Sequence, residues 1–534
     1  MAPSFDYVTY PYRRSADQDA SSAPHHPVVV VGGGMVGLAF AVDMTLRGVP
    51  VVVLDDDDKV SLGSRSICVA KRTLEIFDRL GLGQRCADKG ITWHTGKLLH
   101  GDKLIYEFDL LPQAGHRRPA FVNLQQYYVE TFLIERFDEL GAGEIRWRNK
   151  VVDVTCRDDH VAVDVDTPDG PYRLTCDWLI AADGVRSAVR RKLDLPFVGE
   201  TFHDHFLITD VAMNGDFPNE RRFWFDPTFH TGGSALLHKQ PDDIWRIDLQ
   251  LGPQADREEE LKEEHILPRL HAMLGEDATF TIDWSSVYTF QCRRLERFRH
   301  GRIVFIGDSA HTVSPFGARG GNAGIQDADN LAWKLAAVLA GSAPESLIDS
   351  YDAERIPAAD ENIMNSTRAT DFIAPKNKAM ALFRAAVLDL AEDHLFARGF
   401  VNSGRLSVPD IYETSPLNTP DDDDFSNTMQ PGTPAADAPI SSSGGQEWLL
   451  EALDGAFMLM DFGGATTCGF DNLAIRHVSV GKDFGDRDGM LAKHYDARPG
   501  TAYLFRPDQH VAARFRRSTG AAVAAAFERA MGRT

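Results

Sequence analysis

The residues with the clearest potential for chemistry lie in one glycine-rich stretch, GDSAHTVSPFGARGGNAG, at positions 307–324. The preceding residues, RIVFI, form a pattern typical of a buried strand, and apolar residues at helical spacing follow from Ile325 to Leu335. The stretch itself is too rich in glycine for a strand or for the interior of a stable helix. It is therefore predicted to be a strand-to-helix loop that lets the backbone approach a ligand closely.

The side chains and backbone groups of this loop suit a flavin. Asp308 ends the strand, where its carboxylate can accept hydrogen bonds from ribityl hydroxyls. Gly321 and Asn322 stand at the start of the helix, so their N–H groups and the helix dipole would stabilise negative charge at N1 and the C2 carbonyl of a reduced flavin. Pro315 fixes the local backbone and is expected beside the ring. His311 is interpreted as a structural hydrogen-bonding residue rather than a base.

A second glycine-rich turn, Gly32-x-Gly34-x-x-Gly37, follows four consecutive valines and opens a predicted helix. Gly32 permits a tight turn, Gly34 lets a pyrophosphate approach the backbone, and Gly37 lets helix and strand pack closely. Asp55 ends the next predicted strand, at a spacing that suits a carboxylate on an adenosine ribose. The pattern predicts dinucleotide binding.

A third motif, WLIAADGVRSAVRRKL, is a strand that ends at Asp183-Gly184 and continues into a helix with Ser187 as a candidate N-cap. Arg186 and Arg190 lie one turn apart and can meet a phosphate. A surface turn with salt-bridged arginines explains the same residues equally well, so this motif alone leaves both interpretations open.

Length and composition limit the classes of function. The 534 residues are too many for one core and suggest several domains. A net charge of −22 argues against nucleic acids and anionic membranes as partners, and no apolar run is long enough to span a bilayer. The six cysteines show neither a CxxC motif nor metal-ligand spacing. We expect reduced thiols, no metal and a cytoplasmic protein.

The three motifs together, in this order, resemble those of the FAD-dependent aromatic hydroxylases with the para-hydroxybenzoate hydroxylase fold. The likeness extends over about residues 27–400 and includes NLAWKL and YDAERIP. Within that group the chain is most similar to phenol and 3-(3-hydroxyphenyl)propionate hydroxylases, which carry a C-terminal thioredoxin-like domain. The segment YLFRPDQHVAARF resembles the end of that domain. Because no CxxC is present, we expect the domain to serve packing or dimer contact rather than thiol chemistry.

The resemblance implies a set of FAD contacts. The residues concerned are Gly32, Gly34, Gly37, Asp55, Arg65, Gln126, Asp183, Asp308, Pro315, Gly321 and Asn322. Arg65 and Gln126 match positions that contact FAD, and Asp183 matches an aspartate linked to both FAD and nicotinamide cofactor binding. One departure is the run 56–58, three aspartates where the family usually has a basic residue.

The activity implied by the resemblance is that of a flavin-dependent monooxygenase. In such enzymes NADH or NADPH reduces non-covalently bound FAD, O2 adds at flavin C4a, and the hydroperoxide hydroxylates a phenolic ring. The same motifs would serve a polyketide-type aromatic substrate or a Baeyer–Villiger oxygenation, and a flavoprotein without turnover is a further alternative. The catalytic residues, the substrate and the choice of NADH or NADPH do not follow from the sequence. A homodimer is expected from the resemblance alone.

The predicted fold class is α/β, with a Rossmann-like FAD-binding domain interrupted by a mixed-sheet substrate domain. The expected boundaries are a flexible tail at 1–26, the FAD-binding domain at 27–200 and 285–400, the substrate domain at 201–284, a linker at 401–445 and the thioredoxin-like domain at 446–534. Candidate pocket residues in the substrate domain are His203, His205, Trp224, His238 and Tyr288, although packing is the simpler explanation for each.

Overall fold

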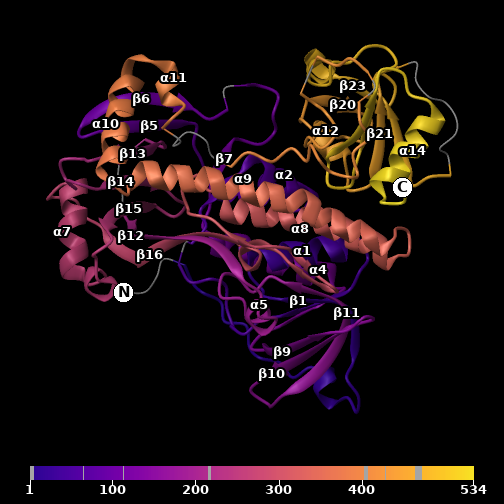
Figure 1. Cartoon of the computed structure of the whole chain (residues 1–534), viewed down its shortest axis with the longest axis horizontal. Helices are drawn as coiled ribbons and strands as arrows, with labels where there is room; N and C mark the ends of the chain where they lie inside the picture. The colour runs from indigo at the N-terminus through magenta and orange to yellow at the C-terminus, as the bar shows by residue number, and fades with distance from the viewer. Residues whose placement is uncertain are drawn as a thin grey trace.

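The structure, a computed structural model, is built from three parts (Figure 1). It describes residues 5–63, 65–111, 113–213, 218–401, 407–421, 423–426, 428–463 and 472–534. Two large sheets and a C-terminal domain lie around a pair of long helices, α8 (Gly320–Leu339) and α9 (Asp349–Ile373), which run side by side through the middle of the molecule. This α/β architecture agrees with the predicted fold class.

The first sheet is mainly parallel, and the three predicted motifs follow its strands β1, β11 and β18. Its strand order is β17-β18-β11-β1-β2-β8, and β10 and β9 extend it beside β11. The strands are β1 (His25–Val31), β2 (Val51–Leu54), β8 (Glu144–Arg146), β9 (Lys150–Cys156), β10 (Val161–Asp166), β11 (Tyr172–Ala181), β17 (Arg299–His300) and β18 (Ile303–Phe305). The valines of β1 are buried because β1 pairs with parallel strands on both sides and helices cover the sheet.

Helices α1 (Met35–Leu46), α4 (Gln126–Leu140) and α8 pack near this sheet, and a short helix, α5 (Ala188–Lys192), follows β11. A small sheet of β3 (Cys68–Ala70), β7 (Phe121–Asn123) and β4 (Ile91–Thr92) lies beside it. Helices α2 (Lys71–Leu80) and α3 (Gly83–Lys89) and the short helix η1 (Ala16–Asp19) complete this part.

The second sheet provides the wall of the candidate substrate site. Its order is β19-β16-β12-β15-β14-β13-β5-β6. The strands are β5 (Thr95–His100), β6 (Lys103–Asp109), β12 (Phe197–Ala212), β13 (Arg221–Phe225), β14 (Ser234–Lys239), β15 (Ile244–Gly252), β16 (Thr281–Leu295) and β19 (His311–Thr312). One face packs on α7 (Glu263–Leu274), which follows the short α6 (Arg257–Glu260), and the opposite face packs on α9 and α10 (Lys378–Asp393).

The second sheet is larger than the substrate domain predicted at 201–284. Strands β5 and β6 come from a much earlier part of the chain, and β13 pairs with β5 in parallel. Strands β12 and β16 cross the two predicted boundaries, at 200 and 285. A single inserted segment therefore does not describe this part of the molecule.

The C-terminal domain has a four-stranded mixed sheet in the order β22-β21-β24-β25, covered by α14 (Gly520–Ala530). The strands are β21 (Phe457–Asp461), β22 (Ile475–Ser479), β24 (Ala502–Phe505) and β25 (Val511–Phe515). Strand β20 (Ile440–Ser442) pairs with β23 (Phe484–Asp486), and α12 (Leu449–Ala452) and α13 (Met490–His494) lie nearby. The thioredoxin-like assignment stays a prediction.

Two segments that were expected to be solvated are packed against the protein. In the predicted tail, Tyr10 stacks on Trp147 with ring centroids 4.6 Å apart, and the Tyr7 hydroxyl accepts a hydrogen bond from the Gly63 N–H at 2.9 Å. In the predicted linker, Tyr412 and Leu417 are buried. Side chains of residues 5–26 therefore contact the rest of the protein, and the described residues of 407–445, which follow the short α11 (Leu395–Arg398), include buried side chains. The division into a tail and a linker stays a prediction.

No helix within the described ranges is long and apolar enough to cross a membrane.

Candidate functional site

The first glycine turn forms a cradle whose glycines have different roles. Gly32 has φ +108°, and a Cβ there would lie 2.4 Å from the Ala182 carbonyl oxygen. A Cβ at Gly37 would lie 2.1 Å from the Gly32 carbonyl oxygen, so both residues must be glycine for the chain to pack. A Cβ at Gly34 would meet only Glu130 Oε1, at 3.7 Å. Gly34 thus faces open space at the N-terminus of α1, as a pyrophosphate site requires.

Asp55 connects this turn to the end of β2 through side-chain hydrogen bonds. Its carboxylate accepts hydrogen bonds from the Gly33 N–H at 2.5 Å and the Asp57 N–H at 2.8 Å. Burial raises the pKa of Asp55 to about 6, against the lowering effect of these two bonds. The predicted ribose contact would use the remaining acceptor capacity of the carboxylate.

Glu130 lies beside the glycine turn and binds the predicted contact residue Gln126, but the sequence analysis did not identify it. Its buried carboxylate accepts hydrogen bonds from the Met35 N–H at 3.2 Å, the Ser61 N–H at 2.7 Å and Gln126 Nε2 at 2.7 Å. Gln126 Oε1 in turn accepts from the Ser66 N–H at 3.2 Å. The only sequence signal was that Gln126 and Glu130 lie four residues apart and share one helix face.

Asp308 lies near enough to Arg65 for the charge of Arg65 to act on its carboxylate, and the role of both as FAD contacts stays a prediction. Both side chains are accessible from the site. Burial within the cradle raises the pKa of Asp308, and the charges of His311 and Arg65 oppose this rise. The Asp308 carboxylate has room to accept ribityl hydroxyls.

Asp327 stabilises residues 307–324, here called the flavin loop, through three polar contacts. It accepts hydrogen bonds from the Gly307 N–H at 2.9 Å and from Arg355 Nε at 2.7 Å, and it pairs with His311 Nε2 at 2.7 Å. His311 is buried and has a structural partner, in agreement with the structural role expected for it. Gly307 has φ +61°, which explains why the loop needs glycine directly before Asp308.

Asn322 anchors the start of α8 through its side chain. The amide oxygen accepts hydrogen bonds from the Ala70 N–H at 2.9 Å and Thr73 Oγ1 at 2.7 Å, and the amide nitrogen donates to the Cys68 carbonyl at 2.9 Å and the Ala318 carbonyl at 2.6 Å. The side chain is thus fully occupied by protein groups. Only the backbone N–H of Asn322 is suited to the predicted contact with the flavin edge.

The backbone strain of this loop lies before Gly321, not at it. Besides Gly307, the residues of this loop with φ values in the left-handed region are Gly317, at +96°, and Ala318, at +52°. A Cβ at Gly321 would lie 2.8 Å from Met35 Cε and from Ser66 Oγ, so the residue is confined by side chains at a helix start. Pro315 is exposed, and its carbonyl accepts the Ala318 N–H at 3.0 Å, which closes the turn.

The third motif forms the capped N-terminus of α5, and one carboxylate oxygen of Asp183 there has no hydrogen-bond partner. Asp183 Oδ2 accepts the Val189 N–H at 3.1 Å, and Ser187 Oγ accepts the Arg190 N–H at 3.0 Å, which confirms the N-cap. Asp183 Oδ1 is buried without a partner, so it has free acceptor capacity for a cofactor. Arg190 donates to the Ser309 carbonyl at 2.9 Å and is buried, so it is structural, while Arg186 is exposed.

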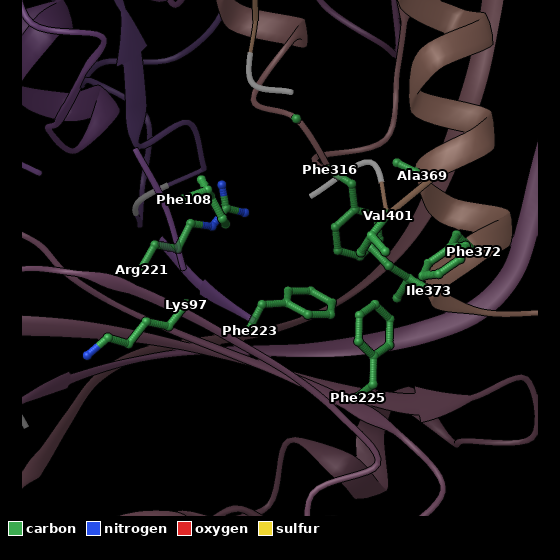
Figure 2. Close-up of a pocket in the computed structure, with 11 residues that line it drawn as sticks. Lys97, Phe108, Arg221, Phe223, Phe225, Phe316, Ala369, Phe372, Ile373 and Val401 are labelled. Carbon is green, nitrogen blue, oxygen red and sulfur yellow. The ribbon is translucent and has the colours of Figure 1, made fainter. Parts of the chain in front are cut away.

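A cavity lies between the second sheet, the flavin loop and α9 (Figure 2). Five phenylalanines form much of its wall, with smaller apolar residues from α9 and from Val401. Its lining consists of Lys97, Phe108, Arg221, Phe223, Phe225, Phe316, Gly317, Ala369, Phe372, Ile373 and Val401. Because Phe316 and Gly317 belong to the flavin loop, the cavity borders the loop that is predicted to hold the flavin ring.

The two basic residues in this lining differ in their environment. The Lys97 ammonium pairs with Glu220 at 2.9 Å and Glu107 at 3.3 Å, and Figure 2 shows it pointing away from the phenylalanines. Arg221 lies beside Phe108 in the same view, and its Nη1 is buried without a hydrogen-bond partner. Arg221 is therefore the cation among the lining residues that is left to meet a ligand.

The residues predicted to line the substrate pocket lie in different environments. Trp224 packs in the core on the face that contacts α7, His203 is exposed, and His205 Nδ1 lies 3.3 Å from the Gly252 carbonyl. Tyr288 packs against the core near the flavin loop. His238 is 2% exposed, and neither ring nitrogen has a partner.

The five cysteines within the described residues are free thiols, of which only Cys156 is exposed, and Cys468 lies outside the described residues.

Comparisons with known proteins support FAD binding by this chain. Residues 25–366 match the model of a family described as FAD binding domain. The chain is 32% identical to 6-methylpretetramide 4-monooxygenase of Streptomyces rimosus, over 92% of this chain and 91% of that protein. It is 28% identical to a 3-(3-hydroxy-phenyl)propionate/3-hydroxycinnamic acid hydroxylase of Escherichia coli O81 (strain ED1a), over 69% of this chain and 66% of that protein.

Among solved structures, the flavin-dependent monooxygenase PieE in complex with FAD and substrate superposes with a TM-score of 0.82. That likeness covers 96% of this chain and 100% of PieE at 21% identity, so it supports the fold. The cradle residues fit FAD, because Gly34 faces open space and Asp183 keeps a buried oxygen without a partner. The chain therefore belongs to the FAD-binding-domain family of flavin-dependent aromatic monooxygenases.

Proposed function

We propose that this FAD-dependent aromatic monooxygenase hydroxylates a phenolic substrate with several fused rings, using NADH or NADPH and O2. The observation that carries the proposal is the phenylalanine-lined cavity next to the flavin loop. Small-molecule sites are lined mainly by apolar and aromatic side chains, and the five phenylalanines of this wall are suited to packing against flat apolar rings. A substrate of one ring would leave much of this wall without contacts.

A relative supports the same substrate class. One relative that matches along nearly the whole chain carries the name 6-methylpretetramide 4-monooxygenase, whereas the hydroxyphenylpropionate enzyme matches over 69% of this chain. We infer a polyketide-type aromatic, which was the alternative substrate class in the sequence interpretation.

The protein groups around the site have distinct tasks. Bound FAD supplies the redox and oxygen-transfer chemistry. The cradle of Gly34 and Asp55 would hold the dinucleotide, and Asp308 would hold the ribityl chain. The first N–H groups of α8, which have no partner within the helix, would stabilise negative charge on the reduced ring. The phenylalanine wall would exclude water from the reacting atoms.

The test uses purified FAD-loaded enzyme and three phenols of increasing size: phenol, 2-naphthol and 2-hydroxyanthraquinone. We expect NADH or NADPH oxidation to be stimulated, with kcat/KM rising with the number of rings. The product should carry a new hydroxyl, identified by mass spectrometry before and after ester hydrolysis. A hydrolysable product would instead indicate a Baeyer–Villiger insertion, and oxidation that no phenol stimulates would contradict turnover on phenols.

Two further expectations concern the protein as a whole. We infer a homodimer, which sedimentation of the holoenzyme would test, and a cytoplasmic location, where NADH and NADPH are available.

A further inference from the structure

One row of side chains crosses the second sheet on the face that lines the cavity. The strand registers place His238 opposite Arg246 and Arg246 opposite Asp210. Since Arg222 pairs with Leu237, the same register sets Arg221 beside His238. Asp248 lies one row further along the same face, opposite Leu236. Four strands thus bring polar side chains together next to the phenylalanine wall.

Several buried polar atoms of this face have no hydrogen-bond partner. They are Arg221 Nη1, both ring nitrogens of His238, both amide atoms of Gln240, and Asp248 Oδ1. Buried polar atoms in native proteins are nearly always paired, because each unpaired group costs its full desolvation energy. So many unpaired atoms on one face indicate a site that is built for a polar ligand.

Of the charged side chains in and next to the row, Arg221 and Asp248 each keep a buried atom that is available to the ligand. Arg246 binds Asp210 through two bonds, of 2.8 and 3.3 Å, so these charges compensate each other. Neither Arg221 Nη1 nor Asp248 Oδ1 has such a partner. His238 is neutral at physiological pH, because burial and the charges of Arg221 and Arg246 hold its pKa well below the ordinary value.

The row lies near Cys68 on β3. Arg221, Arg246 and Asp248 all lie close enough to Cys68 to shift the pKa of its thiol, although burial is the larger cause of that shift. The Cys68 carbonyl in turn accepts a hydrogen bond from Asn322 at the start of α8. Cys68 on β3 therefore lies between the row and the start of α8, where the flavin edge is expected.

We propose that Asp248 takes the proton from the substrate's phenolic hydroxyl and that Arg221 binds the resulting phenolate. The inference rests on the proposed function, because it assumes a phenolic substrate. In the step, the substrate O–H bond breaks, its electron pair stays on the phenolic oxygen, and the proton forms an O–H bond with the Asp248 carboxylate. The negative charge moves from Asp248 to the substrate, beside Arg221, so the buried site keeps its balance of charge.

The choice of Asp248 over His238 as the base follows from their environments. Burial raises the pKa of Asp248 to about 6, while Arg246 and Arg221 lower it and Asp210 raises it. His238 has a pKa well below its usual value and is the weaker base. A base with a pKa near the working pH combines ionisation with basicity, which favours Asp248.

The test counts protons on binding rather than turnover. The probe is 2-naphthol with ¹³C at its hydroxyl-bearing carbon, whose chemical shift separates phenol from phenolate. It is added to oxidised holoenzyme at about pH 7.5, where an unperturbed phenol with a pKa of about 10 is neutral. Calorimetric titration in two buffers with different ionisation enthalpies counts the protons released.

In the wild type we expect 2-naphthol to bind as phenolate with almost no proton released, because Asp248 keeps the proton. Asp248→Asn should release about one proton for each phenolate formed, since the transferred proton then has no carboxylate acceptor. Arg221→Gln should bind the probe as neutral phenol or lose it. Asp243→Asn is the matched control, because Asp243 is an exposed aspartate at the turn before β15 and should behave as wild type.

Turnover gives a second readout. The wild-type rate should fall as pH drops through about 6, because Asp248 must be ionised to act, and this limb should be absent in Asp248→Asn. The rate of that variant should fall about 100-fold or more, as for loss of a general base. Wild-type enzyme that binds 2-naphthol as neutral phenol, or not at all, overturns the proposal. The proposed function fails separately, if no phenol of the ring series stimulates NADH or NADPH oxidation.

Discussion

At the scale of single residues, Asp308 and Gly321 are predicted to act on FAD in different ways. Asp308 would contact the ribityl chain in both redox states, so Asp308→Ala should weaken FAD binding first. A Cβ at Gly321 would press on Met35 Cε and Ser66 Oγ, which are flexible side-chain ends, so Gly321→Ala should still bind FAD.

The Gly321→Ala change should instead disturb the N–H groups at the start of α8. Loss of one well-placed donor to a developing anion costs about 3 kcal/mol, or roughly a hundredfold in rate. We expect a lower flavin potential and slower flavin reduction, measured by redox titration and FAD dissociation constants on both variants. If Gly321→Ala loses FAD while the residual holoenzyme keeps the wild-type potential, the loop serves binding and not electrostatic tuning.

Asn322 and Glu130 show how far sequence reasoning reached at this scale. The position of Asn322 at a helix start followed from the glycine-rich loop and the helical pattern after it. Its four side-chain bonds did not, because three of the partner groups lie on β3 and α2, far away in the sequence. Glu130 was missed for the same reason, since its main partners are backbone N–H groups of two other segments.

At the scale of secondary-structure elements, the first glycine turn allows two similar changes to be separated. A Cβ at Gly37 would collide with the Gly32 backbone, so Gly37→Ala should push α1 from β1 and lower the free energy of unfolding by about 1–3 kcal/mol. A Cβ at Gly34 meets only Glu130 Oε1 at 3.7 Å, so Gly34→Ala should fold with wild-type stability.

The FAD affinities of these two variants complete the comparison. Gly34→Ala should weaken FAD binding because its methyl group occupies the space through which a pyrophosphate reaches the backbone. Urea unfolding of the apoprotein and FAD titration measure the two effects. Wild-type affinity in Gly34→Ala, with normal folding, would show that the pyrophosphate lies elsewhere.

The elements themselves were predictable to different degrees. Strand β1, the turn after it and α1 followed from local periodicity and glycine spacing. The second sheet did not follow as a whole, because β5 pairs with β13, more than one hundred residues later in the chain. No local pattern in β5 points to such a partner.

At the scale of the whole molecule, a buried charge network ties the C-terminal domain to α8 and α9. Glu354 on α9 binds Arg506 and accepts from Lys334 at 2.7 Å, while Asp508 accepts from the Trp333 ring nitrogen at 3.1 Å. Burial raises the pKa of Glu354, but the charges of Arg506 and Lys334 lower it by more. The pKa of Glu354 therefore lies below its ordinary value.

Glu354→Gln should therefore destabilise the protein by about 3–5 kcal/mol near neutral pH, because it leaves buried cations without their anion. A depressed folded-state pKa stabilises the protein above the unfolded value of about 4.3, and this stability is lost as pH falls further. Urea unfolding should show a smaller effect at more acidic pH. Glu528→Gln, which removes one partner of the peripheral pair with Arg533, is the control and should cost about 1 kcal/mol or less. Equal effects of the two variants would contradict the account.

The packing of residues 5–26 and of the described residues of 407–445 was not predictable from the sequence. Both segments are polar on average, which favours a solvated state. A few side chains, such as Tyr10 on Trp147 and Tyr412 on His510, attach them to the protein, and composition does not reveal such individual contacts.

The most direct test of the central claim is a single turnover of FAD-loaded, prereduced enzyme with 2-hydroxyanthraquinone and ¹⁸O2, analysed by mass spectrometry. The account predicts a product with one ¹⁸O atom in a new ring hydroxyl and little hydrogen peroxide. Unchanged 2-hydroxyanthraquinone, with all the oxygen recovered as hydrogen peroxide, would contradict the assignment of this cavity to the hydroxylation of phenols with several fused rings.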